Sequence, residues 1–447
     1  MINKKINYLS ILLLVFFVSN THCIAQKNKK SEPTSTSTSD DYYGDNTIRY
    51  EDYVYKKFIK TILLHDESFE LSQPVLNLDS EEKLKLSFDD MDADFKTYTY
   101  TFIHCNANWE PDDLQPSEYI DGFTDNAIND YRYSNNTLQK YTHYSTVFPT
   151  TTTRFTKSGN YILKVYMDGN PEKIAITRRF MVYQNKIMIQ SHVTPASIIE
   201  DRNYKQELDF TIDHTGYQIA NPFGDLKIVI TQNNRWDNIK TNFKPVFVKD
   251  MELVYDYDQE NVFPGGNEFR YFDIKSIRYH SERIYSIKTD SLGPHVILTN
   301  DESRSFKRYS TYTDINGKFL VKVDEGTNSD VEAEYCYVSF FLPYDGTLTD
   351  GNLYVFGAFN GWKCNQENLM HYNEKRFGYE CTLYLKQGYY NYEYVFLKDG
   401  ATMADETLIE GSHYETENDY TIYVYHHQQG TFYDQLIGVK RLNSMKN

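Results

Sequence analysis

Apolar and polar residues alternate with a period of two along most of the chain after about residue 48. In residues 161–166 (YILKVY), Tyr161, Leu163 and Val165 fall on one face of an extended segment. The same alternation recurs in residues 208–212, 226–231, 335–342, 381–386, 392–397 and 419–425. Such a period is typical of antiparallel strands that bury one face. We therefore predict an all-β fold built from tandem immunoglobulin-like or early-set β-sandwiches.

Turn signals between these segments divide the chain into domains. A chain of 447 residues is too long for one ordinary hydrophobic core, so several domains are expected. The first predicted β-sandwich spans residues 48–184 and closes with the strand RRFMVY. A middle β-domain spans residues 185–323. After the polar linker DEGTNSD, a C-terminal β-sandwich spans residues 331–447.

The first 25 residues have the features of a secretion signal. Two lysines precede an apolar stretch, residues 9–18, which is too short to span a bilayer. Small residues, Cys23 and Ala25, precede the predicted cleavage site. The alternative is a lipoprotein signal, in which Cys23 carries the lipid. Residues 26–47 are rich in Ser, Thr and charge, and we predict a disordered polar linker.

The net charge and the length of the apolar runs limit the partners and the cellular location that we expect for this chain. The formal net charge is −17, so the chain lacks the basic excess that nucleic acids and anionic membranes require. After residue 25 no apolar run is long enough to span a bilayer. We predict a periplasmic protein without nucleic-acid partner or membrane insertion. With 41 tyrosines, the chain is suited to half-buried sheet faces and protein interfaces.

Neither the spacing of the cysteines nor any known catalytic motif indicates a metal site or an active site. Beyond the signal the chain has Cys105, Cys336, Cys364 and Cys381, with no CxxC pair of the kind that holds zinc. Two states stay open, a disulfide between Cys364 and Cys381 or buried free thiols. The chain also lacks a nucleophile elbow, an HExxH motif and a P-loop. We predict no enzyme activity and no catalytic, cofactor or metal residues, although a hydrolase with an unrecognised carboxylate pair is a rival.

Two turns carry aromatic residues beside charges. The segment QNNRWDN follows a strand and presents Arg235 and Trp236. In the segment FPGGNEFRYFD, a Pro-Gly-Gly turn precedes alternating aromatic and charged residues. These turns either fold onto their own sheets or expose anchors for a partner, because Trp, Tyr and Arg are enriched in interface hot spots. The candidate partner contacts are Arg235, Trp236, Phe263, Phe269, Tyr271 and Phe272.

The C-terminal segment resembles the early-set sandwich of glycogen-binding (CBM48-like) modules. The resemblance is carried by Gly357, Phe359, Asn360, Trp362, Met370, Gly388, Tyr390, Tyr392, Tyr394, Phe396, Asp399 and Gly400. In such modules two tryptophans stack on the sugar. Trp362 matches the first, but Ala401, Thr402 and Met403 stand where the second is expected. We therefore expect no glycan binding, and a periplasmic or surface glycan-binding protein is kept as the alternative function.

Residues 48–440 as a whole resemble the DUF5103 family of Bacteroidota. The matching stretches are residues 86–109, 118–123, 141–144, 158–166, 177–183, 232–238, 263–273 and 410–420. Members of that family are described as the plug of the type IX secretion translocon. The resemblance implies a periplasmic, non-enzymatic protein without cofactors. Its implied partner is the SprA-type outer-membrane barrel, whose periplasmic opening it closes when no cargo passes.

Overall fold

The structure, a computed structural model, describes residues 47–446. The predicted signal peptide, the alternative lipidation of Cys23 and the polar linker up to residue 46 lie outside the described residues. Strands account for 46% of the described residues and helices for 5%, which confirms the all-β prediction. Every segment with the period of two forms a strand, because alternate β-branched and aromatic side chains fill one face of a sheet.

The first sandwich consists of two main sheets that face one another. One sheet has the order β1 (Tyr53–Val54), β12 (Ile174–Tyr183), β11 (Gly159–Met167), β5 (Tyr98–Cys105) and β7 (Asp125–Ala127), with β3 (Val75–Asn77) beside β12. The other has the order β2 (Ile59–Asp66), β4 (Leu84–Asp90), β9 (Thr142–Phe148) and β8 (Asp130–Tyr133). A small pair, β6 (Ile120–Gly122) and β10 (Thr153–Phe155), and the turn α1 (Pro116–Tyr119) complete it.

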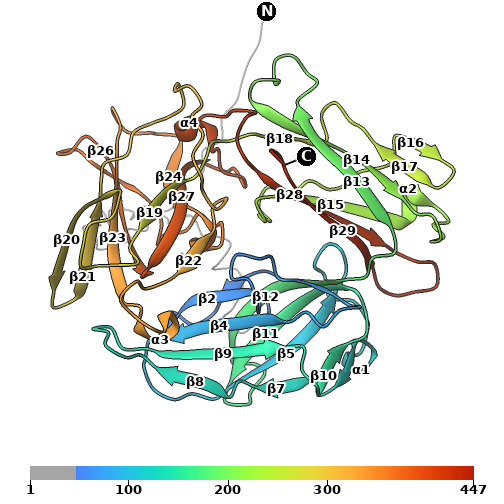
Figure 1. The fold of residues 1–447 in the computed structure, drawn as a ribbon, viewed down its shortest axis with the longest axis horizontal. Helices are drawn as coiled ribbons and strands as arrows, with labels where there is room; N and C mark the ends of the chain where they lie inside the picture. The colour runs from blue at the N-terminus through green and yellow to red at the C-terminus, as the bar shows by residue number, and fades with distance from the viewer. Residues whose placement is uncertain (1–46, 447) are drawn as a thin grey trace, which may run out of the picture. The chain divides into compact units, whose positions relative to one another are not determined.

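The second sandwich joins strands from two distant parts of the chain. Its first sheet has the order β13 (Met188–Pro195), β14 (Lys205–Asp213), β17 (Glu252–Tyr255) and β16 (Phe247–Lys249), with β18 (Val262–Pro264) on β14. Its second sheet has the order β15 (Leu226–Gln232), β28 (Asp419–His426) and β29 (Gln435–Asn443), and the turn α2 (Pro222–Asp225) precedes β15. Figure 1 shows the red β28 and β29 beside the green β15, although the third sandwich separates them in sequence.

The third sandwich is formed by residues between β18 and β28. One face holds β19 (Arg270–Asp273), β27 (Gly388–Lys398) and β22 (Phe319–Val321), with β24 (Gly351–Phe356) on β27. The other sheet has the order β20 (Ile284–Asp290), β21 (Gly293–Leu298), β23 (Tyr335–Pro343), β26 (Gly378–Lys386) and β25 (His371–Asn373). Short turns are α3 (Ser329–Glu332), η2 (Ala358–Asn360) and α4 (Thr407–Glu410).

Each sandwich has its own aromatic-rich core. Tyr161, Leu163 and Val165, predicted to share a face, are fully buried in the first core. Leu208 and Phe210 lie in the second core. The third core contains Tyr390, Tyr392 and Tyr394 from β27, packed against β23 and β26. Tyrosine serves these cores because its ring supplies apolar area while its hydroxyl finds a partner, as Tyr392 and Tyr394 do on Asp301 at 2.7 Å.

The strands of the first sandwich lie between Tyr53 and Tyr183, whereas the sheets beyond it combine strands from both of the other predicted domains. Residues 270–298 were assigned to the middle domain, but β19 and β21 belong to the third sandwich. Residues 419–443 were assigned to the C-terminal domain, but β28 and β29 pair with β15 of the second. The third sandwich is thus inserted into the second. Periodicity identifies strands but says nothing about which distant strand each one pairs with, so this insertion was missed.

Candidate interaction surface

The loop between β15 and the following segment joins all three sandwiches. It comprises residues 232–238, called here the junction loop, and it belongs to the second sandwich. Arg235 is 2% exposed and points into the third sandwich, where it pairs with Glu393 at 3.4 Å and with Glu406. Its guanidinium also lies over Trp362, 4.8 Å from the ring centre. Burial alone would lower the pKa of Arg235, but Glu406 and the loop's own Asp237 raise it.

Trp236, the next residue, packs against the first sandwich. Its ring meets Trp109 edge-on at 5.1 Å, and it stacks on Tyr423 of β28 at 5.9 Å. Arg179 of β12 lies over Trp109 and Trp236 at 4.6 and 5.5 Å. The contact continues as a buried apolar cluster between the outer faces of the two sandwiches, including Cys105, Ile162, Met181, Val229, Tyr425 and Leu436. This buried face fixes the first sandwich on the second.

Four of the six candidate partner contacts named from the sequence are buried inside the protein. Arg235, Phe263, Phe269 and Phe272 are 2, 1, 4 and 0% exposed, so the prediction that they meet a partner on the surface is wrong. Phe263 and Phe272 fill the second and third cores. Aromatic residues beside charges in a turn look the same in the sequence whether they bind another protein or pack against another sandwich of the same chain. Trp236 and Tyr271 are partly exposed, and their role with a partner stays a prediction.

Trp362 is not presented as a platform for sugar rings. It packs against Phe269 at 5.8 Å and Phe356 at 5.4 Å, and the Arg235 guanidinium covers it. A stacking platform needs a free ring face. The aromatic position that resembles the glycogen-binding modules therefore works in the junction between the second and third sandwiches.

Of the two states left open for Cys364 and Cys381, the structure has the free thiols, as it does for Cys105 and Cys336. Cys364 lies in a small cluster with Tyr354 and Phe356, whereas Cys381 belongs to the core of the third sandwich. Burial raises the pKa of both thiols to about 12, so neither is a thiolate nucleophile at neutral pH.

A buried ion pair joins the first sandwich to the third. Asp89 of β4 accepts hydrogen bonds from Lys386 Nζ of β26 at 2.6 Å and from the Tyr335 hydroxyl of β23 at 2.7 Å. His143 Nδ1 lies 2.7 Å from the other Asp89 oxygen. Burial alone would raise the pKa of Asp89, but Lys386 and His143 hold it below its usual value. The carboxylate is therefore ionised in the folded state.

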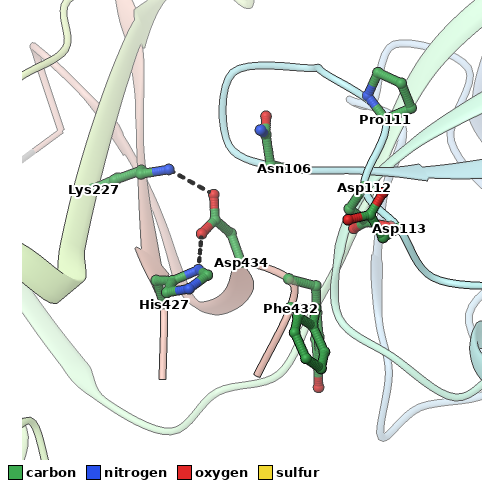
Figure 2. A pocket seen from close by; sticks show the side chains of 9 residues that line it. Asn106, Pro111, Asp112, Asp113, Lys227, His427, Phe432 and Asp434 are labelled. Carbon is green, nitrogen blue, oxygen red and sulfur yellow. Dashed lines mark hydrogen bonds and ion pairs between the residues drawn. The ribbon is translucent and has the colours of Figure 1, made fainter. Parts of the chain in front are cut away.

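A polar pocket of about 220 Å³ opens between the first and second sandwiches. Figure 2 shows Lys227 and His427 reaching Asp434 on one wall, with Asn106 and Asp113 on the opposite side and Phe432 below. Asp434 is buried and accepts from Lys227 Nζ, His427 Nδ1 and the Ala107 amide, each at 2.9 Å. Burial alone would raise the pKa of Asp434, but these donors lower it. The pocket's charges are thus mostly used to hold the two sandwiches together.

One acidic group among residues 47–446 has the spacing of a cation site. Oxygens of Glu207, Asp209 and Asp256 lie within 4.8 Å of one another on the outer face of the second sandwich. Burial and the neighbouring Glu207 and Asp256 raise the pKa of Asp209 to about 6. Sequence reasoning missed this group because Asp256 lies far from β14 along the chain and meets it only through the pairing of β14 with β17.

Comparison with known proteins assigns the chain to a family. Residues 59–184 match the family model described as "Type 9 secretion system plug protein 1st domain". The crystal structure of a hypothetical protein from Parabacteroides merdae ATCC 43184 aligns with 32% sequence identity and a TM-score of 0.85, covering 89% of this chain and 100% of that one. The chain belongs to the type IX secretion plug-like family. No curated protein matches it.

The family match coincides with a structural unit. It begins at Ile59, the first residue of β2, and ends one residue after β12, so it includes the two main sheets of the first sandwich apart from β1. Plug-like proteins of this family are not enzymes, and the match indicates a secretion-system partner in the cell envelope. Among the described residues, no helix is long and apolar enough to cross a membrane.

Two free sheet edges of this plug-like protein carry exposed apolar side chains. β8 ends one sheet of the first sandwich, and all four of its residues are exposed. β16 ends a sheet of the second sandwich, with Phe247 and Val248 59% and 49% exposed. Unpaired edges offer backbone donors and acceptors to another strand, so β8 and β16 are candidates to bind a partner.

Proposed function

We propose that this protein is a periplasmic plug of the type IX secretion system. It binds the SprA-type outer-membrane translocon from the periplasmic side and closes its opening when no cargo is passing. The proposed role is non-catalytic and requires neither metal nor cofactor.

The observation that carries the proposal is the match of the first sandwich to the plug protein first domain. The match includes every strand of both main sheets of that sandwich except β1, so it concerns most of a folding unit and not a short motif. The relation to the Parabacteroides merdae protein extends the likeness of fold over most of the chain.

The junctions between the sandwiches support a mechanical role. A protein that closes a wide pore must keep its shape against the partner. Here the junction loop, the apolar cluster around Trp109 and the Asp89–Lys386 pair connect the three sandwiches in every pairing. Several buried contacts of this kind resist hinge motion between domains, which polar and small domain interfaces allow.

The proposal is tested by affinity purification of a tagged copy, expressed at its native level, from detergent-solubilised envelopes. We expect the giant outer-membrane barrel to co-purify, most strongly in a strain that lacks secreted cargo. In a strain without this protein, we expect the outer membrane to admit a large antibiotic such as vancomycin. Recovery of the protein without the barrel, together with an unchanged permeability barrier, would refute the proposal.

A further inference from the structure

Strand β8 lies at the end of its sheet, and one of its two sides is free to pair with an added strand. It pairs only with β9, through the partners Asp130–Ser145, Tyr131–Tyr144, Arg132–His143 and Tyr133–Thr142. Its other side meets no strand in the described part of the chain. Figure 1 shows β8 outermost in its sheet, beyond β9. An antiparallel edge of this kind has backbone groups that can pair with an added strand.

One face of β8 carries a row of exposed aromatic rings. Tyr131 lies 4.9 Å from Phe95 and 5.9 Å from Tyr133, measured between ring centres. Phe95, Tyr131 and Tyr133 are 56, 39 and 54% exposed. Tyr131 also contacts the buried Tyr144 at 5.9 Å, which holds the row against the core. A partner that covers this row would remove substantial apolar area from water.

The opposite face of β8 borders a pocket of about 330 Å³, called here the β8 pocket. Asp130 and Arg132 alternate with the tyrosines and therefore point to this face. Lys85, His143 and Ser145 from the neighbouring strands line it, and Asp330 of α3 closes it from the third sandwich.

The β8 pocket contains one buried side-chain nitrogen whose hydrogen-bonding capacity the described residues do not use. His143 is 6% exposed, and its Nε2 has no hydrogen-bond partner among the described residues. Its Nδ1 is directed at the ionised Asp89, so the imidazole is oriented by that bond. An Asp330 oxygen lies 3.6 Å from Nε2, within the range of an ion pair but longer than a hydrogen bond.

One carboxylate that lines the β8 pocket has no basic partner among the described residues. Lys85 is 3.4 Å from Asp330, and Arg132 is 3.8 Å from Asp130, so each basic side chain already has a carboxylate. Glu67, also in the pocket wall, is exposed and has no ion pair in residues 47–446. The pocket therefore suits a group that donates hydrogen bonds and carries positive charge.

We propose that β8 is the strand on which the translocon docks, by addition of an extended segment of the barrel to its free edge. The segment has alternating apolar and basic residues. Its apolar residues cover Phe95, Tyr131 and Tyr133, and a Lys or Arg side chain enters the β8 pocket. This inference rests on the proposed function and assigns its binding site to the first sandwich, the part that the family model matches.

Hydrogen–deuterium exchange of the full-length protein, alone and bound to the purified detergent-solubilised barrel, tests the mode of docking. Added strands protect backbone amides, whereas contact through side chains alone does not. We expect peptides covering residues 128–134 to exchange more slowly in the complex. Protection of residues 246–251 around β16 instead, with none at β8, would overturn the inference and assign docking to the second sandwich.

Two variants test the two faces separately. Phe95→Ala with Tyr133→Ala removes two of the three rings of the aromatic row, and Glu67→Lys reverses the unpaired charge. We expect each to weaken binding to the barrel at least tenfold. Controls with exposed side chains elsewhere, Tyr285→Ala with Phe306→Ala and Glu172→Lys, should change it less than twofold. Each variant must unfold at the wild-type temperature, which the exposure of these side chains favours.

The outcomes separate the two proposals. If the wild-type protein does not bind the barrel, the proposed function fails and the docking strand with it. If the wild type binds and both β8 variants bind equally well, the plug function stands and the docking strand is refuted.

Discussion

At the scale of single residues, a few buried charged and aromatic side chains hold the sandwiches together. The chain has three tryptophans, and all of them, Trp109, Trp236 and Trp362, lie around the junction loop. Arg235 lies over Trp362 and pairs with Glu393, which is buried, and with Glu406, which is partly buried. A buried charge whose partner is removed is far more costly than a lost surface ion pair.

Replacing Arg235 by Met should therefore lower the free energy of unfolding by about 3–5 kcal/mol. The change leaves Glu393 and Glu406 without their cation. Because every tryptophan lies at this junction, the fluorescence emission should also shift to longer wavelength before global unfolding in denaturant. The control Lys173→Met removes an exposed pair with Asp168 and should cost under about 0.5 kcal/mol. Equal effects of the two variants would contradict the role given to Arg235.

Asp209 should make stability depend on pH. Its folded-state pKa is raised from 3.8 to about 6, so the folded protein holds this proton more tightly than the unfolded chain. The free energy of unfolding consequently falls as pH rises across that interval. Asp209→Asn should remove this slope and raise the free energy of unfolding at pH 7 by about 1–2 kcal/mol, as measured by urea titrations at several pH values. The exposed Asp168→Asn serves as the control, and an unchanged slope in Asp209→Asn would contradict the assignment.

At the scale of elements, the positions of some strands depend on close contacts that only glycine allows. Gly159 begins β11 with φ +150°, and a Cβ there would lie 2.4 Å from His104 Nε2 and 3.2 Å from the Asp434 carbonyl oxygen. His104 in turn is held between Asp112 and the Ser158 carbonyl. The glycine thus lets the first sandwich approach the segment before β29 closely.

Gly159→Ala should lower the free energy of unfolding by about 2–3 kcal/mol, because the new methyl group clashes with a buried ring. Gly169→Ala is the matched control. It also has a positive φ, +65°, but its Cβ would meet nothing within 4 Å, so only backbone strain of about 1 kcal/mol is expected. Chemical denaturation of both variants measures the difference. If the two lose the same stability, the clash with His104 is not the cause.

The sequence predicted elements better than their partners. Tyr161, Leu163 and Val165 were assigned to one buried face correctly, because alternation is a local signal that survives in a single segment. Arg235 and Phe269 were assigned to the surface, because a turn rich in charge looks the same whether it meets water or another sandwich. The Glu207–Asp209–Asp256 group and the β8 pocket depend on strand pairing, which no local pattern records.

At the scale of the whole molecule, contacts between the sandwiches make three cores respond together. The Asp89–Lys386 pair is 1% exposed on both sides and is joined by the Tyr335 hydroxyl. Together with the junction loop, this coupling predicts that wild-type unfolding is one cooperative transition, even though each sandwich has a core of its own.

The substitution Lys386→Met should split the single unfolding transition into two. It leaves Asp89 buried with fewer donors, so we expect a loss of about 3–5 kcal/mol and a first calorimetric peak from one sandwich before the others. Asp89→Asn with Lys386→Met removes both charges and should recover part of the loss in a double-mutant cycle. A single unshifted peak in Lys386→Met would show that this pair does not couple the sandwiches.

The insertion of the third sandwich into the second has a consequence for the biogenesis of the protein. A chain that emerges from its N-terminus delivers β15 early, but β15 must wait for β28 before its sheet can close. Until then an apolar strand edge stays open and requires protection by chaperones or by delayed folding. The first sandwich has no such delay, since its strands are contiguous. An incomplete chain would thus carry a finished first sandwich beside an unfinished second one, and only a molecule synthesised to β29 would have all three sandwiches fixed together.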